Sequence, residues 1–373
     1  MTIINEIEFI IDHIDPLGQG VFKKDDKIYF IPKTLPGESG TAQILKRKKG
    51  VHFCKKVSID SISEKRVKPS CSHFQDCNGC HFLHTDYDTE LYYKLQSFKR
   101  MLAPLLHESQ IEVVKADNRL NYRNRVQLHY HKKAKVLGLI DGRSNQIISV
   151  PECIICKPNI QKKIAELYKD QNWLNLAPDE TKGHIEIYDS PQGLKTTWNQ
   201  RYASGGFTQV NESMNEKMKL LVFNELKEVS PKSTLDLFGG DGNLSNSLNK
   251  KTIIDRYDKK MPSHFISLDL HDEDALNRFT QKSQEDYDTF IIDPPRAGFS
   301  HIKDWTTALS PSNLFYISCH PQTMVRDLIR IQELNQYTIK KIVMLDLFPG
   351  TFHFEAFIVL KKDLNCFTND SLT

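Results

Sequence analysis

Several features are missing from this sequence of 373 residues, and each absence argues against a class of protein. No apolar run approaches the ~18 residues that a membrane-spanning helix needs, so no such helix is expected. The first ten residues, MTIINEIEFI, lack a basic stretch followed by an apolar one, so we expect a cytoplasmic protein without a secretory leader. The net charge is only +3, which excludes a uniformly basic nucleic-acid binder but permits a basic face.

The eight cysteines are not spread as a disulfide framework, because three of them crowd between Cys71 and Cys80. That spacing indicates a metal site in a reducing compartment. Positive charge is also uneven. Residues 46–68 carry nine Lys and Arg against two acids, and residues 118–140 carry six and no acid. Such segments can neutralise phosphates, although each alone could equally be a solvated face.

Residues 5–60 read as short strands separated by turns such as DPLGQG and KDDK, which predicts a small β-barrel, with the OB type as one option. Residues 86–106 repeat leucine and phenylalanine at spacings of three and four, which predicts an amphipathic helix capped by Thr85 or Asp86. Residues 120–150 return to strand-like runs.

From about residue 204 the pattern alternates between strand and helix. A helix is expected within residues 207–226, with Asn211 as a possible N-cap, and a short one over residues 243–249. Two strands joined by a turn end the alternation. This order predicts an α/β fold with a mostly parallel, doubly wound, Rossmann-like sheet closed by a terminal hairpin, and ligands at the carboxyl ends of its strands.

The motif DLFGGDGN, residues 236–243, lies between a predicted strand and helix. Its glycines let the backbone approach a ligand, and Asp236 can hold a cation or an amide. The motif is not G-x-G-x-x-G, so S-adenosylmethionine, which has no phosphate, fits better than a dinucleotide. Asp258 is placed to bind a ribose diol and Asp269 an adenine amino group. The alternative is an ordinary glycine turn.

DPPRAG, residues 293–298, follows a buried strand and forms a rigid turn with Asp293 at the mouth of the site. Such turns also occur in N-methyltransferases, which remain an alternative. In YISCHPQT, Cys319 follows a strand and starts a helix, whose N-terminus should lower the thiol pKa. Cys319 is therefore the candidate nucleophile, the alternative being a buried structural cysteine.

Glu355 follows a Pro-Gly turn and alternates with Phe352 and Phe354. Apolar surroundings would raise its pKa and suit it to act as a base, whereas an exposed strand glutamate is the alternative. Cys71, Cys77 and Cys80 need a fourth ligand, which is Cys153 or Cys156, and spacing alone does not decide between them. Three clustered cysteines and one remote one fit a [4Fe–4S] cluster better than zinc.

Together these motifs resemble the RNA uracil-5-methyltransferase family. FTQVN, DLFGGDGN, DPPRAG, SCHPQT and FPGTFHFE appear in that family's order, and the resemblance covers nearly the whole chain. GQGVFKKDDKIYFIPKTLPGE looks like its TRAM domain, and KRVKPSCSHFQDCNGCHFLH like its cluster segment. The resemblance implies three domains: a TRAM-like RNA-binding barrel over residues 1–62, an iron–sulfur domain over 63–205, and a methyltransferase domain over 206–373.

The resemblance also implies residue roles. Cys319 would be the nucleophile and Glu355 the base, and YRNR, residues 122–125, would lie near a flipped RNA base. The cluster ligands would be Cys71, Cys77, Cys80 and Cys153. The cofactor contacts would be Gln209, Phe238, Asn243, Asp258, Asp269 and Asp293.

The sequence departs from the family at three places. His320 replaces the usual Asn after the nucleophile, and Asn78 replaces a glycine. The helix after the second strand is nearly deleted, which makes Asp255 an alternative to Asp258.

The function that the resemblance implies is S-adenosylmethionine-dependent C5-methylation of a uridine in RNA. The combination of TRAM domain and cluster is most similar to the branch that acts on 23S ribosomal RNA. The alternatives are methylation of a tRNA T-loop uridine and a non-catalytic RNA-binding assembly factor. No membrane partner and no obligate protein partner is expected.

Overall fold

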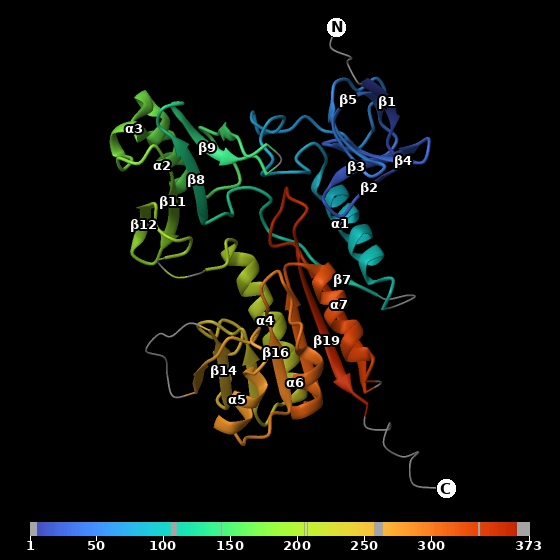
Figure 1. The fold of residues 1–373 in the computed structure, drawn as a ribbon, viewed down its shortest axis with the longest axis vertical. Helices are drawn as coiled ribbons and strands as arrows, with labels where there is room; N and C mark the ends of the chain where they lie inside the picture. The colour runs from blue at the N-terminus through green and yellow to red at the C-terminus, as the bar shows by residue number, and fades with distance from the viewer. Residues whose placement is uncertain are drawn as a thin grey trace. The chain divides into compact units, whose positions relative to one another are not determined.

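The computed structural model describes residues 6–105, 110–142, 144–204, 206, 208–256, 264–334 and 336–363 (Figure 1). The chain divides into two compact units, each discontinuous in sequence. Unit 1 comprises Met1–Ser97, Ala116–Ser213 and Leu347–His353, and unit 2 comprises Phe98–Lys115, Met214–Asp346 and Phe354–Thr373. Among the described residues, no helix combines the length and apolar character that crossing a membrane requires.

The N-terminal part of unit 1 is a sheet with six strands in its described residues, in the order β1-β5-β6-β4-β3-β2. One face buries Phe9, Phe22, Tyr29 and Ile31, where Phe22 stacks on Tyr29 with ring centroids 4.6 Å apart. The strands predicted within residues 5–60 are confirmed, while closure into an OB-type barrel stays a prediction. The strands are β1 (Glu6–Ile10), β2 (His13–Ile14), β3 (Gln19–Lys24), β4 (Lys27–Pro32), β5 (Ser39–Lys48) and β6 (Val51–Lys56).

A second sheet of unit 1 has the order β10-β9-β8-β11-β12 and is antiparallel throughout its described strands. Its strands are β8 (Arg125–His131), β9 (Val136–Ile140), β10 (Ile147–Ser149), β11 (Lys182–Ser190) and β12 (Gly193–Trp198). Helix α2 (Pro158–Tyr168), the 3-10 turn η1 (Lys169–Gln171) and α3 (Trp173–Leu176) follow β10, and α2 and α3 share its apolar core. The strands predicted within residues 120–150 are confirmed, but β11, β12 and these helices were not anticipated.

Helix α1 (Tyr87–Leu102) begins at the position that the sequence predicts and ends four residues earlier than residue 106. Asp86 caps it, because its carboxylate accepts hydrogen bonds from Thr89 N and Thr89 Oγ1, both at 2.8 Å. Thr85 is not the cap, since its hydroxyl donates to Lys65 O instead.

Unit 2 is built on a sheet that has eight strands in the described residues, in the order β15-β14-β13-β16-β17-β19-β18-β7. The strands from β15 to β17 are mutually parallel, β19 is antiparallel to β17 and β18, and β7 adds in parallel to β18. The predicted α/β class, parallel core and terminal hairpin are therefore confirmed, whereas the edge strand β7 was not predicted.

The strands of this sheet are β7 (Glu112–Val114), β13 (Thr234–Leu237), β14 (Lys251–Asp255), β15 (Phe265–Ser267), β16 (Thr289–Ile292), β17 (Asn313–Ser318), β18 (Tyr337–Leu345) and β19 (Glu355–Lys362). The helices that connect them are α4 (Glu212–Val229), α5 (Ala275–Lys282), α6 (Ile302–Leu309) and α7 (Pro321–Gln332).

The predicted short helix over residues 243–249 is wrong, because this segment forms successive hydrogen-bonded turns. Gly240 and Gly242 have positive φ values of 54° and 77°, so the chain enters the segment in a conformation that cannot start a right-handed helix. Asn and Ser side chains also compete for the backbone hydrogen bonds that so short a helix would need.

Candidate active site

The glycine-rich turn after β13 surrounds a buried carboxylate. Asp236 is 1% exposed; its Oδ2 accepts a 2.5 Å hydrogen bond from Ser245 Oγ, while Oδ1 has no hydrogen-bond partner among the described atoms. A Cβ on Gly239 would lie 2.6 Å from Asp236 Cγ, so only glycine fits there. Burial raises the pKa of Asp236 to about 7, against the opposing bond from Ser245. This site offers a buried carboxylate oxygen to a cation or an N–H group.

The second strand presents Asp255 to the same turn. Asp255 Oδ2 accepts a 3.1 Å hydrogen bond from Gly240 N, which fixes the glycine turn to the end of β14. Asp258, the first candidate for the ribose contact, lies among residues 257–263, outside the described residues. Asp269 is exposed just beyond β15, where its Oδ1 accepts His271 N at 3.0 Å.

The other residues predicted to contact S-adenosylmethionine are divided between the two units: Phe238 and Asn243 belong to unit 2 and Gln209 to unit 1. Phe238 has a φ of +62° and packs edge-to-face on Phe299 with ring centroids 5.2 Å apart. Asn243 exchanges two amide hydrogen bonds with Asn215, at 2.9 and 3.1 Å. Gln209 belongs to unit 1, where its carbonyl oxygen accepts Asn124 Nδ2 at 3.0 Å.

Cys319 follows β17 directly and precedes His320, the N-cap of α7. The side chain is half-buried, and burial is the largest cause that raises its pKa to about 12; the carboxylates of Glu355 and Asp293 add to it. The Arg296 guanidinium acts in the opposite direction and lowers the pKa of the thiol. The predicted lowering of the thiol pKa is therefore wrong, because desolvation and two carboxylates outweigh one guanidinium and a helix end.

Glu355 is the first residue of β19 and is 4% exposed. Burial raises the pKa of its carboxyl group well above the usual range, Asp293 raises it further and Arg296 opposes both. The predicted increase and its cause, apolar surroundings, are confirmed, since the neighbouring Phe354 and Ala356 are also buried. Asp293 itself has a pKa raised to about 6 by burial.

These shifts show that four groups of unit 2 act on one another electrostatically: a thiol, two carboxyl groups and a guanidinium. The sequence predicted three of them, Cys319, Glu355 and Asp293. It missed Arg296, although the residue stands inside the DPPRAG motif, where a cation beside a nucleophilic thiol is a recognisable signal.

A further residue that the sequence did not reveal holds the DPPRAG turn in place. Asp327 on α7 is fully buried and accepts Phe299 N at 2.6 Å and the Tyr316 hydroxyl at 2.7 Å. A Cβ on Gly298 would come within 2.4 Å of Asp327 Oδ2, so this glycine permits the close approach. Arg326 completes the link by donating to Ala297 O at 2.8 Å. The helix that starts beside the nucleophile thus fixes the turn that carries Asp293 and Arg296.

The cysteine segment lies in unit 1. The thiols of Cys71, Cys77 and Cys80 each have their pKa raised, chiefly by burial, and Cys153 adds to the shift in all three. Cys156 is fully buried, and its interaction with Cys153 lowers the pKa of the Cys153 thiol and raises the pKa of its own. Within the described ranges, no group of three or more Cys, His, Asp or Glu side chains is already arranged around a metal position.

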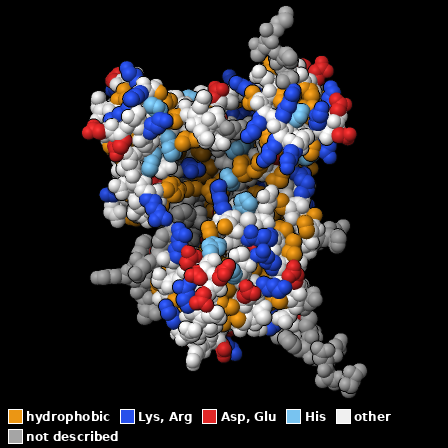
Figure 2. Space-filling view, viewed as in Figure 1, with side chains coloured by type: hydrophobic (Ala, Val, Ile, Leu, Met, Phe, Trp, Pro, Cys, Tyr) orange, Lys and Arg blue, Asp and Glu red, His pale blue; other side chains and the backbone are white. Residues whose placement is uncertain are grey.

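The two basic segments differ in the structure. Lys46, Arg47, Lys48 and Lys49 are exposed where β5 turns into β6, and Figure 2 shows Lys and Arg side chains over this sheet. In the segment 118–140, by contrast, Arg119 pairs with the buried Glu90 and Arg125 with the buried Glu186. The second segment is therefore not an open cationic surface along its whole length.

The YRNR segment is also mostly internal. Tyr122, Asn124 and Arg125 are at most 5% exposed. Asn124 N donates to Val210 O at 2.9 Å, so the structure places YRNR beside the FTQVN motif. Arg125 Nη1 donates to Glu186 Oε1 at 2.9 Å.

Known proteins share the motifs of this site. The tRNA (Uracil-5-)-methyltransferase family profile matches residues 259–363, which contain DPPRAG, Cys319 and Glu355. The 23S rRNA (uracil(1939)-C(5))-methyltransferase RlmD of Shewanella sediminis is 27% identical, with 94% of each chain covered. The protein of that name from Marinomonas posidonica is also 27% identical, with 95% of each covered. The resemblance to RNA uracil-5-methyltransferases is confirmed.

The fold comparison agrees with this RNA uracil-5-methyltransferase resemblance. The crystal structure of the tRNA (uracil-54, C5)-methyltransferase of Pyrococcus abyssi, in complex with S-adenosyl-L-homocysteine, superimposes with a TM-score of 0.68. It covers 95% of this chain and 100% of the other at 19% identity, so it shows that the fold is shared.

Proposed function

We propose that this protein is an S-adenosylmethionine-dependent methyltransferase that acts on carbon 5 of a uridine in 23S ribosomal RNA. The observation that carries the proposal is the electrostatic group of Cys319, Glu355, Asp293 and Arg296 at the carboxyl ends of β16 and β17 and the start of β19. The names of relatives that cover more than nine-tenths of the chain support the same reaction and the same RNA.

The glycine turn fits the methyl donor. Gly239 leaves the backbone bare beside Asp236, and the partnerless Oδ1 of Asp236 can accept a hydrogen bond from a polar ligand. Asp255 is favoured over Asp258 for the ribose hydroxyls, since it ends β14 and already holds the glycine turn. The other residues that we propose contact S-adenosylmethionine are Gln209, Phe238, Asn243, Asp269 and Asp293.

The chemistry starts at Cys319. Its thiol is protonated in the resting protein, because its pKa is about 12, so the proton leaves to solvent as the sulfur attacks carbon 6 of the uracil. Arg296 stabilises the developing thiolate. The new S–C6 bond shifts the ring electrons toward carbon 5 and forms an enolate.

Methyl transfer and release follow from that adduct. When bound, S-adenosylmethionine supplies a methyl group on a positively charged sulfur. Carbon 5 forms a bond to this methyl group while the sulfur–methyl bond breaks. Glu355, as the carboxylate, then removes the carbon 5 proton, and the C6–S bond breaks to restore the ring double bond and the thiolate. A positioned base of this kind contributes ~10²–10⁴-fold.

We also propose that Cys71, Cys77, Cys80 and Cys153 hold a [4Fe–4S] cluster. Cys153 supports this choice because it raises the pKa of all three of the other thiols. Cys156 interacts with Cys153, and Cys80 raises the pKa of Cys156. When bound, such a cluster takes four thiolates and cross-links the segments that carry them.

The proposed domain division is 1–62, 63–205 and 206–373, with the first part a TRAM-like barrel that binds RNA. The exposed cations of residues 46–49 support RNA binding there. The target uridine must leave its stack before carbon 6 can reach Cys319, which single-stranded loops allow at least cost.

The proposal is tested by mapping 5-methyluridine in 23S rRNA and tRNA from a strain that lacks this protein, and by restoring the missing mark with purified protein and S-adenosylmethionine. We expect one uridine of 23S rRNA to lose and regain its methyl group. Loss from tRNA alone would redirect the proposal to the tRNA branch. A nitrogen-methylated product, or no change in any RNA, would overturn it.

A further inference from the structure

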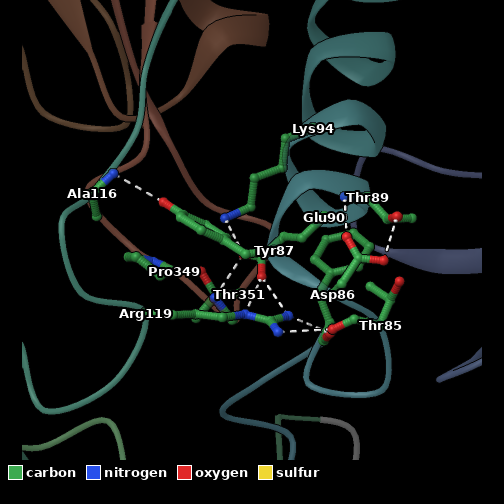
Figure 3. A network of polar contacts seen from close by, with 12 residues as sticks. Thr85, Asp86, Tyr87, Thr89, Glu90, Lys94, Ala116, Arg119, Pro349 and Thr351 are labelled. Carbon is green, nitrogen blue, oxygen red and sulfur yellow. Dashed lines mark hydrogen bonds and ion pairs between the residues drawn. The ribbon is translucent and has the colours of Figure 1, made fainter. Parts of the chain in front are cut away.

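A buried polar network in unit 1 forms hydrogen bonds to the loop that precedes Glu355, the proposed base. The loop, residues 347–353, connects β18 to β19 and belongs to unit 1, although both strands belong to unit 2. Figure 3 shows Lys94 and Arg119 converging on Glu90 from above and below, with Pro349 and Thr351 of the loop beside them.

Glu90 is the centre of this network and has no exposed surface. Its Oε1 accepts a 2.6 Å hydrogen bond from Gly350 N and a 2.8 Å contact from Lys94 Nζ. Its Oε2 accepts Arg119 Nη2 at 2.7 Å and Nε at 2.9 Å. One carboxylate therefore joins two cations to the backbone of the loop, in a geometry where charge-assisted bonds are strong.

Other groups hold the loop at neighbouring atoms. Lys94 Nζ donates to Phe348 O at 3.2 Å, and the Tyr122 hydroxyl donates to Pro349 O at 3.0 Å. Gly350 O accepts two backbone N–H groups from the end of the cysteine segment, His81 at 2.7 Å and Phe82 at 3.0 Å. Three consecutive loop residues are thus fixed by side chains or backbone of unit 1.

The loop leads directly to Glu355, which stands at the end of its strand. Glu355 pairs with Leu345 of β18, but the ladder to β17 on the other side stops at Ala356. Strand ends open more easily than strand centres, because fewer bonds hold them. The fixed residues 348–350 lie five positions before Glu355 and restrain that opening along the backbone.

We propose that Glu90 is a positioning residue for the base Glu355: by fixing residues 348–350 it holds the first residue of β19 where the carbon 5 proton must be removed. The inference rests on the proposed function. It assigns the Glu90 network to one step, proton removal, rather than to RNA binding or methyl transfer.

Glu90→Gln tests the inference, because it keeps the side-chain shape and removes the charge that holds Lys94, Arg119 and Gly350. A base displaced by about 1 Å acts about 10²-fold more slowly. Methyl transfer precedes proton removal, so the variant should accumulate a methylated protein–RNA adduct that survives denaturation. The adduct is measured with methyl-labelled S-adenosylmethionine and 23S rRNA from a strain lacking the protein.

Glu38→Gln is the matched control. Glu38 is equally buried in the same unit and accepts Arg66 Nε at 2.5 Å and Nη2 at 2.7 Å, in the N-terminal sheet. It should show no more adduct than the wild type. Thr351→Val is a milder second variant, since it removes the hydroxyl that donates to Phe348 O at 2.8 Å within the loop. We expect about 2- to 10-fold slower adduct resolution from that loss.

Adduct accumulation in Glu90→Gln or, if that variant does not fold, in Thr351→Val supports the inference, provided that Glu38→Gln resolves its adduct normally. Wild-type adduct levels in folded Glu90→Gln overturn it, as do equal effects of Glu90→Gln and Glu38→Gln. If the wild type transfers no methyl group to any RNA, the proposed function itself fails, which is a separate and recognisable result.

Discussion

Replacing Asp236 by Asn should make the unliganded protein more stable at neutral pH. Folding moves this carboxyl group from water to a site with 1% exposure and raises its pKa from 3.8 to about 7. When the pKa of an acid is higher in the folded than in the unfolded protein, the acid does not reduce the free energy of unfolding at a pH below the unfolded pKa. The reduction grows as pH rises and is complete above the folded pKa. At 1.36 kcal/mol per pKa unit, the full cost of the shift to about 7 is on the order of 4 kcal/mol.

The change with pH isolates this effect. About two pKa units separate pH 5 from the folded pKa of about 7, so the stability advantage of Asp236→Asn should grow by on the order of 3 kcal/mol between pH 5 and pH 8. The new amide also leaves an N–H unpaired, which costs about 1–3 kcal/mol at both pH values and cancels in the difference.

Urea unfolding of both proteins at the two pH values measures this difference. Ser245→Ala, which removes the 2.5 Å bond to the carboxylate, is the control and should show no such advantage. The same variant, Asp236→Asn, should also bind S-adenosylmethionine more weakly than the wild type. A stability gap that does not change from pH 5 to pH 8 would refute the assignment of a costly buried carboxylate.

Two further predictions concern the cysteines. Because the pKa of Cys319 is about 12, the rate at which iodoacetamide alkylates it should still rise about tenfold per pH unit from pH 7 to pH 10. Alkylation should be faster in Glu355→Gln, because this variant removes a carboxylate that disfavours the thiolate. Site-resolved mass spectrometry measures the rate, and a plateau near pH 8.5 would contradict the prediction. Cys153→Ser should abolish the visible iron–sulfur absorbance of anaerobically purified protein while Cys156→Ser retains it, and the opposite pattern would make Cys156 the ligand.

The sequence was most informative where the physics is local. The strands β13, β16 and β17 are short apolar runs that end at a motif, and all their described residues but one are buried, so pattern and outcome agree. Asp86 was identifiable as a cap because the donor that it satisfies is three residues away. Motif order also placed Asp236, Cys319 and Glu355 on one sheet, near the end of β13, directly after β17 and at the start of β19.

The sequence was least informative where distant residues decide. The pKa of Cys319 depends on Asp293, Arg296 and Glu355, whose proximity exists only after the sheet forms. In the same way, Arg119 read as a free cation because its partner Glu90 is separated from it by 29 positions. Long-range partners of this kind leave no periodic signal in the chain.

In the proposed reaction Cys319 forms a transient bond to the uracil, and Glu355 allows that bond to break. Incubation of Cys319→Ala and of Glu355→Gln with 23S rRNA and methyl-labelled S-adenosylmethionine, followed by separation of the denatured products, measures both steps. We expect neither adduct nor methyl transfer with Cys319→Ala, and a methylated, denaturation-stable adduct with Glu355→Gln. Methyl transfer by Cys319→Ala, or turnover by Glu355→Gln without an adduct, would contradict the proposed reaction.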